Sequence, residues 1–361
     1  MKQKLRKETG ITLVALVVTI VILLILAGVT LMYTMGDNSI FQKAQEAKNK
    51  TEEGIKNEQE YMNSIDNMVN EYLNGTGNGG GTEIPTGPKD EPIENIKSDW
   101  ATIEKIAKEI AKDDTITSEI EEVKVVVDGK RYTIKPGDIF EVEYNGEVRR
   151  VRVLGFKHDD LVDQTVYGGM HEKASISFEF LDFMTGETYK SMNATDTNEN
   201  GWAATQMRKD LNGYSNNNAA QSGAIGGLGE NLNNKSYIKQ VKKKYIGTYN
   251  NASSVTTCND YLWLLAASEI VNSGYQSGAY GNAIINEGSQ YKYYQGITEP
   301  YNAASTNRVK KTSESGDVNH WWIRSPRYST GASFCFVSNG GDVNGSNVAS
   351  CAYGVAPGFC V

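Results

Sequence analysis

The chain begins with a long apolar run. No residue between Ile11 and Met32 carries a charge, in the stretch ITLVALVVTIVILLILAGVTLM. These 22 residues, at about 1.5 Å each in a helix, would span the roughly 30 Å hydrocarbon core of a bilayer. Four basic residues lie within residues 2–7. Because basic flanks stay on the cytoplasmic side, we expect a transmembrane segment at 11–35 and a globular part outside the cytoplasm, at the cell membrane or cell surface.

The pattern changes twice after this segment. Apolar residues recur every three or four positions from Ser39 to Leu73, which predicts a stalk helix over 36–73. Residues 74–92 hold six glycines and three prolines and have no period, so we expect a linker there. The remaining residues, 93–361, have the mixture of apolar and polar residues that a folded domain needs.

The early part of this domain predicts both helices and strands. Apolar spacing indicates helices over 100–111 and 203–211. Asp128-Gly129 and Asn145-Gly146 each separate two alternating segments, as in β-hairpins. A further strand is expected over 174–181, and 261–271 is a buried apolar segment. The fold class predicted from this pattern is α+β.

Composition excludes several function classes. The chain has 36 basic and 44 acidic residues and a net charge of −8, which argues against a nucleic-acid partner. Its three histidines are far apart and its four cysteines form no CxxC pair, so neither a metal site nor a cofactor is predicted. Asp159, Asp160, Asp163 and the segment 196–200 offer oxygen atoms, but their spacing is not that of an EF-hand, and a solvated acidic loop is the simpler interpretation.

The N-terminus resembles that of type IV prepilins and pseudopilins, on the residues KETG followed at once by the apolar run. The resemblance implies a leader over 1–10, cleavage between Gly10 and Ile11 by a prepilin peptidase, and other pilin-like subunits as partners. The family usually has a glutamate at the fifth mature position, where this chain has Ala15. That difference leaves assembly into a long pilus open. An ordinary secretory signal peptide is the alternative for this segment.

The C-terminal third carries a second resemblance. The motif WWIRSP at 321–326, supported by 201–213 and 262–270, is similar to C-type-lectin-like domains of the formylglycine-generating-enzyme type. It covers about 140–361 and implies a mixed domain with long irregular loops. Trp321 and Trp322 would then fill a core, and Arg324 would bridge backbone carbonyls or a carboxylate.

The last 34 residues use only eleven amino-acid types and lack Lys, Glu, Gln, Met and Trp entirely. No codon that ends in a pyrimidine encodes those five types, whereas all eleven types present have such codons. This is the composition that adenine-directed mutagenesis of AAC or AAT codons would leave. It resembles the variable proteins of diversity-generating retroelements, with a variable region at 328–354.

That resemblance divides the tail into two sets of residues. The expected frame is apolar: Val337, Val343, Val348, Val355, Pro357 and Phe359. The expected ligand-binding residues use the Tyr, Ser and Asn alphabet of antibody loops, and the ligand would be a protein or a glycan. They are Tyr328, Ser329, Thr330, Ala332, Ser333, Ser338, Asp342, Asn344, Ser346, Asn347, Ser350, Ala352 and Tyr353.

The cysteines leave two alternatives open. Cys335 and Cys360 both lie in short apolar segments, so they could form a disulfide or remain buried thiols. Formylglycine-generating enzymes use a reactive cysteine pair, but the spacing here does not match. We therefore expect a surface-displayed, pilin-like binding protein and no enzyme. The alternatives are an extracytoplasmic enzyme that uses these cysteines and a pseudopilin component of a secretion or uptake apparatus.

Overall fold

A computed structural model describes Lys48 and residues 87–216, 218, 221, 223–247, 254–272, 284–298, 306–327, 330–343 and 345–361. The predicted leader, membrane segment and stalk (1–10, 11–35 and 36–73) lie outside the residues described from position 87 on. Within the described ranges, no helix has the length and apolar character needed to cross a membrane. A compact unit runs from Thr86 to Val361.

For the residues that the structure describes, the predicted α+β class with a mixed C-type-lectin-like domain is wrong; the predicted long N-terminal helix lies outside these residues. What the structure describes is rich in β-structure, with seventeen strands against four helices, and the longest helix has 13 residues. Residues 261–271 are predicted to be a buried apolar segment, and 262–271 are indeed buried. They contain a single helical turn, α6 (Ala267–Ile270).

The central sheet contains four antiparallel strands in the order β17-β7-β5-β4. It joins the C-terminal strand of the chain to strands that lie about 200 residues earlier. Both faces of β7 are buried, so its sequence ISFEF does not alternate in exposure. The bounds of the four strands are Gly358–Cys360 (β17), Ile176–Phe180 (β7), Glu147–Phe156 (β5) and Ile139–Tyr144 (β4).

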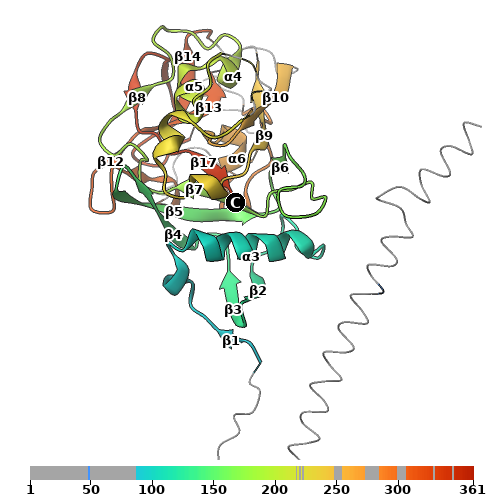
Figure 1. Ribbon diagram of the computed structural model, residues 1–361. Coiled ribbons are helices and arrows are strands. Elements are labelled where there is room, and N and C mark those ends of the chain that lie inside the picture. The colour runs from blue at the N-terminus through green and yellow to red at the C-terminus, as the bar shows by residue number, and fades with distance from the viewer. Residues whose placement is uncertain are drawn as a thin grey trace, which may run out of the picture. The chain divides into compact units, whose positions relative to one another are not determined.

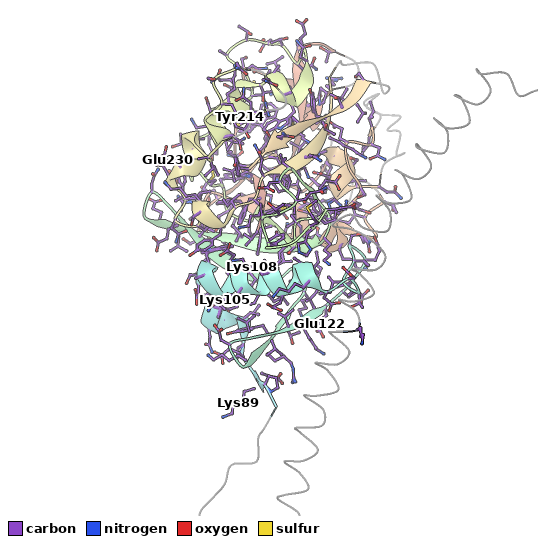
Figure 2. The ribbon with its side chains drawn as sticks, turned by 45° about the vertical axis from the view of Figure 1, so that its right-hand side comes forward. Lys89, Lys105, Lys108, Glu122, Tyr214 and Glu230 are labelled. Atoms are coloured by element: carbon purple, nitrogen blue, oxygen red, sulfur yellow. The ribbon has the colours of Figure 1, made fainter. Side chains whose placement is uncertain are left out.

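Helix α3 (Trp100–Lys112) lies between this sheet and a second, three-stranded sheet (Figure 1). The Trp100 ring packs on Phe178 and Phe359 of the central sheet, at centroid distances of 5.4 and 5.7 Å. The second sheet has the order β1-β3-β2. Lys105 and Lys108 lie along the same helix (Figure 2). The strands of the second sheet are Lys89–Asp90 (β1), Lys130–Ile134 (β3) and Val123–Val127 (β2).

Strand β1 corrects the domain boundary. It pairs in parallel with β3, although it falls within the predicted linker 74–92. The folded unit therefore begins a few residues earlier than position 93. Both predicted hairpins are present, and their turn residues Asp128-Gly129 and Asn145-Gly146 all have positive φ, between 50° and 81°. Positive φ at both central positions is the geometry for which these dipeptides are favoured.

The remaining strands form small sheets above the central one. The predicted helix at 203–211 is divided at Thr205 into α4 (Gly201–Ala204) and α5 (Gln206–Asn212), because Thr205 is extended and caps α5 by accepting a bond from the backbone of Arg208. Gly201 has φ of 59°, and a Cβ there would lie 1.8 Å from the Ile246 carbonyl oxygen, so only glycine fits.

Four further sheets hold these strands, in the orders β10-β9-β6, β13-β14-β15, β16-β8 and β11-β12. Their bounds are Asp160–Leu161 (β6), Lys190–Ser191 (β8), Val241–Ile246 (β9), Val255–Asp260 (β10), Lys310–Lys311 (β11), Val318–Asn319 (β12), Trp321–Pro326 (β13), Ser333–Val337 (β14), Gly345–Val348 (β15) and Ala352–Tyr353 (β16).

A buried charge group lies on the central sheet. Glu179 on β7 is fully buried and bonds to Arg152 on β5 at 2.6 Å and to Lys310 on β11 at 2.7 Å. Burial opposes ionisation of Glu179, but the charges of Arg152 and Lys310 outweigh it, so the pKa of this carboxyl is lowered. Three segments that are distant in the sequence are joined at one carboxylate.

Removal of one partner should expose the cost of that burial. We expect Arg152→Met to lower the free energy of unfolding by about 3–5 kcal/mol, because Glu179 would keep a buried charge with a single cation. The surface pair Arg131–Asp90, at 3.2 Å, provides the control. Arg131→Met should change stability by less than about 1 kcal/mol. Urea unfolding measures both variants, and equal losses would contradict this account.

Candidate functional site: the C-terminal surface

The C-terminal tail does not form a loose appendage. Strands β13, β14 and β15 pair antiparallel in sequence order, and β16 then pairs with β8. The backbone at Gly354 bonds to β13, since Trp322 donates to the Gly354 carbonyl at 3.2 Å. The last strand, β17, enters the central sheet, and Val361 is fully buried. The tail is thus held at both ends by the core.

An aromatic cluster lies beneath and within this surface. It consists of His320, Trp322, Phe336 and Tyr353. The Tyr353 ring is 4.7 Å from Trp322, 4.9 Å from Phe336 and 5.3 Å from His320. Trp322 is fully buried, while the other three rings are partly exposed. The cluster therefore gives the tail a rigid base with polarizable rings at its outer edge.

The loop 193–200 holds the other side of the tail. The buried Asn198 side chain donates to the carbonyls of Thr330 and Ser333, both at 2.7 Å. Its backbone donates to the Gly331 carbonyl, and the Asn193 backbone donates to Ala349. The composition of this segment, NATDTNEN, is typical of loops but gives no sign of which chain segment it contacts. Sequence reasoning missed Asn198 for that reason.

A polar cavity of about 250 Å³ opens beside this loop. Its lining contains amide, hydroxyl and charged groups and little apolar surface. These groups could make hydrogen bonds to a ligand that contacts the neighbouring tail. They include Asn193, Thr195, Thr197, Glu199, Gln206 and Lys209.

The structure places the predicted ligand-binding residues unevenly. Ser350 and Ala352 are exposed, and Ser333 is buried beneath the surface, so Ser333 is corrected from a contact residue to a supporting one. Tyr328, Ser329 and Asn344 lie outside the described residues. The other seven are partly exposed: Thr330, Ala332, Ser338, Asp342, Ser346, Asn347 and Tyr353.

Most of the expected apolar frame is buried. Val348 is the exception, since it is partly exposed on β15. Asn347 and Tyr353, both expected to be displayed, bond to each other through the Asn347 amide and the tyrosine hydroxyl at 2.7 Å. The buried members are Val337, Val343, Val355, Pro357 and Phe359.

The motif WWIRSP supplies the support below the surface. The indole N–H groups of Trp321 and Trp322 donate to the carbonyls of Arg308 and Lys190. The fully buried guanidinium of Arg324 donates to three backbone carbonyls at 2.7–2.9 Å. It also bonds to both oxygens of Glu269, at 2.7 and 2.8 Å. A flat guanidinium can satisfy all of these acceptors at once.

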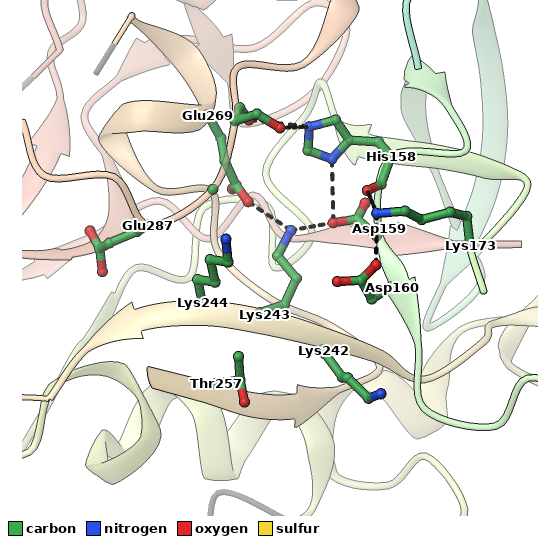
Figure 3. A pocket seen from close by; sticks show the side chains of 12 residues that line it. His158, Asp159, Asp160, Lys173, Lys242, Lys243, Lys244, Thr257, Glu269 and Glu287 are labelled. Carbon is green, nitrogen blue, oxygen red and sulfur yellow. Dashed lines mark hydrogen bonds and ion pairs between the residues drawn. The ribbon is translucent and has the colours of Figure 1, made fainter. Parts of the chain in front are cut away.

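Glu269 continues this contact into a chain of buried charges. Lys243 lies between Glu269 and Asp159, 2.7 Å from the first carboxylate and 2.6 Å from the second (Figure 3). Burial opposes ionisation of both carboxyls, yet their cationic neighbours lower the pKa of each. Glu287, which bonds to Ser325, has a raised pKa because burial dominates there.

The cysteine positions argue against thiol chemistry. Cys335 lies on β14 and Cys360 on β17, which belong to different sheets, and the structure contains both as thiols. Of the two alternatives, the structure has the buried thiols, because the two apolar segments belong to separate sheets. Burial raises the pKa of both thiols, so neither is activated as a thiolate.

The comparisons with known proteins concern the same region. Residues 176–361 match the family model described as a domain of unknown function, DUF6273. This match covers just over half of the chain. The protein belongs to the DUF6273 family. No curated protein and no solved structure matches the chain.

The DUF6273 segment begins at the first residue of β7, after β4 and β5. Strand β5 pairs with β7 over several residues and contributes Arg152 to Glu179. Helix α3 covers Phe178 and Phe359, which both belong to the matched segment. The family segment of this chain therefore completes its core with residues that precede it.

This dependence predicts different behaviour for two fragments. The fragment 86–361 should unfold in one cooperative transition. The fragment 176–361 should have no cooperative transition, because it lacks β5 and α3 and would expose Phe178, Phe359 and an uncompensated Glu179. Near-UV circular dichroism with thermal melting distinguishes them. A cooperative melt of the shorter fragment would show that the family segment is an independent unit.

The buried carboxylates predict the pH dependence of stability. Glu269 and Asp159 have folded pKa values below the ordinary 4.5 and 3.8, so the unfolded chain binds protons first as the pH falls. Their stabilising contribution is complete above those ordinary values and is lost as the pH decreases through the folded ones. Glu287, whose folded pKa is raised by burial, changes stability with pH in the opposite direction. We expect the urea midpoint to fall steeply below about pH 4.5; a constant midpoint down to pH 3 would contradict this.

Proposed function

We propose that this DUF6273 protein binds a protein or glycan ligand through its C-terminal tail, and that the tail is a diversified surface. The division of the tail into buried and exposed residues carries the proposal. Apolar residues are anchored in the core, and the predicted ligand-binding positions between them bear small or polar side chains or Tyr. Exposed changes at such positions usually alter stability by less than about 0.5 kcal/mol, so the surface tolerates variation.

The fixed surroundings of the tail support the same function. Strand β8, the aromatic cluster and the loop 193–200 contact the tail from different sides. Strand β8, the loop 193–200 and the cluster residues His320 and Trp322 precede the compositionally restricted segment, so they would stay constant while the tail changes. Phe336 and Tyr353 belong to that segment. A rigid support reduces the entropy that a binding surface loses when it meets its ligand.

The codon argument supports diversification independently of the fold. Every residue type from Tyr328 to Val361 can be encoded by a codon that ends in a pyrimidine. Codons AAC and AAT, when mutated at adenines, give this set, and the set includes the Tyr, Ser, Gly and Asn that suit binding surfaces. Deep sequencing of the gene from a cell population should find substitutions at tail positions and none at Trp321, Trp322 or Arg324.

The direct test is a paired set of substitutions in the purified full chain. Ser350→Tyr and Ala352→Asn should change binding to glycan and protein panels while the free energy of unfolding changes by less than about 0.5 kcal/mol. Trp322→Ala should lower that free energy by about 3–5 kcal/mol, because it removes a fully buried ring.

Two outcomes would reject the proposal. If Ser350→Tyr destabilised the protein as much as Trp322→Ala, the tail would be part of the core. If the tail variants bound every panel member as the original chain does, ligand contact would lie elsewhere. Asn339 is exposed and lies in the turn after β14. The substitution Asn339→Ala is the stability control for the tail variants, because it lies in the same segment.

A further inference from the structure

A second cavity lies away from the tail, beside the chain of buried charges. Its volume is about 140 Å³, and it is lined by residues next to β6, by β9 and by the segment 287–289 (Figure 3). His158, Asp159 and Ser289 all belong to its lining. The cavity is large enough for a small organic group and too small for a polymer chain.

A serine and a histidine are in contact in this cavity. The Ser289 hydroxyl oxygen lies 3.0 Å from Nε2 of His158. Ser289 is exposed, so its hydroxyl is open to a ligand. The His158 ring is held from its face by Tyr291, at a centroid distance of 4.0 Å. This is the separation at which a histidine can take a proton from a serine hydroxyl.

The other ring nitrogen of His158 faces a carboxylate. Nδ1 is buried and has no hydrogen bond. It lies 3.6 Å from Asp159 Oδ1, close enough for an ion pair when the ring is protonated. A proton on Nδ1 is favoured there, because a lone pair would face negative charge. Nε2 is then left as the acceptor for the Ser289 hydroxyl in the neutral ring. In the protonated ring, Nε2 can donate to the Ser289 carbonyl at 3.1 Å.

Asp159 is fixed in place and charged. It accepts bonds from Lys243 at 2.6 Å, from Ser177 at 2.7 Å and from Tyr291 at 2.9 Å. Burial opposes its ionisation, but Lys243 and His158 outweigh burial and hold its pKa well below the ordinary value. The orientation of the carboxylate is thus set before any ligand binds, which is the condition for a positioning residue.

We propose that Ser289 is a nucleophile, His158 its base and Asp159 the positioning carboxylate, in a site that accepts the acyl group of a small ester. The Ser289 oxygen forms a bond to the carbonyl carbon as its proton passes to Nε2 of His158. The bond from that carbon to the leaving oxygen then breaks, and His158 returns the proton to the leaving alcohol. Water then attacks the acyl carbon and gives its proton to Nε2 of His158; the bond to the Ser289 oxygen breaks, His158 returns the proton to that oxygen, and the acid is released.

The lysines of the lining fit this chemistry. Lys242 and Lys244 are exposed neighbours on β9, while Lys173 is paired with Asp160 at 2.7 Å. Exposed ammonium groups near the cavity would favour an ester whose leaving group or acid carries negative charge. Among the residues that the structure describes, none of the buried cysteines and no tail residue lines this cavity.

The first experiment uses p-nitrophenyl acetate with the full chain. We expect an acetyl group on the peptide that contains Ser289, detected by mass spectrometry. Ser289→Ala should abolish it, and His158→Gln should slow it by about 100-fold, as for loss of a general base. The matched control is Ser315→Ala, at an exposed serine in the turn between β11 and β12, which should leave the rate unchanged. Acetylation of Ser289 no faster than that of Ser315 would overturn the proposal.

A second pair of variants does not depend on how His158→Gln folds. Ser289→Cys would place a thiol beside the imidazole, and the resulting ion pair should increase the rate of alkylation by iodoacetamide about tenfold over that of Ser315→Cys. Peptide mapping separates both sites from the native cysteines. Equal alkylation rates at the two positions would show that His158 does not act on residue 289, and would reject the site.

Discussion

The contact between Arg324 and Glu269 connects the parts of this protein that the chain separates most widely. Arg324 lies on β13, beneath the tail, and its guanidinium donates to the carbonyls of Lys244, Leu264 and Glu287. Glu269 forms ion pairs with both Arg324 and Lys243, and Lys243 forms a second ion pair with Asp159. Each charge has a partner of opposite sign, which is what permits all four to be buried. Within this chain of charges, removal of Glu269 would leave Arg324 without its ion pair, and removal of Lys243 would leave Asp159 without its lysine.

This constraint explains how a polar, loop-rich chain holds a defined surface. The tail itself has few large apolar residues, so it cannot form a core alone. Its frame residues instead enter a core already built from the central sheet, and β17 completes that sheet. Aromatic rings of β13 and β14 support the outer face. Stability therefore resides in residues below the tail, and the exposed positions are released from a structural role.

The two candidate sites stand at opposite ends of the same network. Arg324 supports the sheet that carries the tail, whereas Asp159 orients His158 beside Ser289. The proposed binding surface would use side chains whose identity can change. The serine and histidine arrangement depends on exact identities and on a fixed carboxylate. These different requirements mean that ligand recognition and acyl chemistry in this chain can be tested separately.

Local sequence determined the elements whose signal is itself local. The spacing of apolar residues indicated α3, and Asp128-Gly129 and Asn145-Gly146 indicated two hairpins, because a two-residue turn needs positive φ at both positions. The restricted alphabet of the tail and the apolar frame positions were also visible in the sequence. The β-rich class was not, since short apolar segments have no periodicity that distinguishes a buried strand from a helix.

Only the tertiary structure decided which distant residues meet. Cys335 and Cys360 have similar neighbours in the sequence, yet they lie in different sheets. Asn198 gave no signal in the sequence, because its side-chain amide donates hydrogen bonds to backbone carbonyls more than 130 positions away. His158 and Ser289 are separated by 131 positions and meet only because β6, β9 and the 287 segment pack around Lys243. Sequence patterns report local geometry, whereas such contacts depend on how whole strands are ordered, and that order is fixed by the burial of charge and apolar surface together.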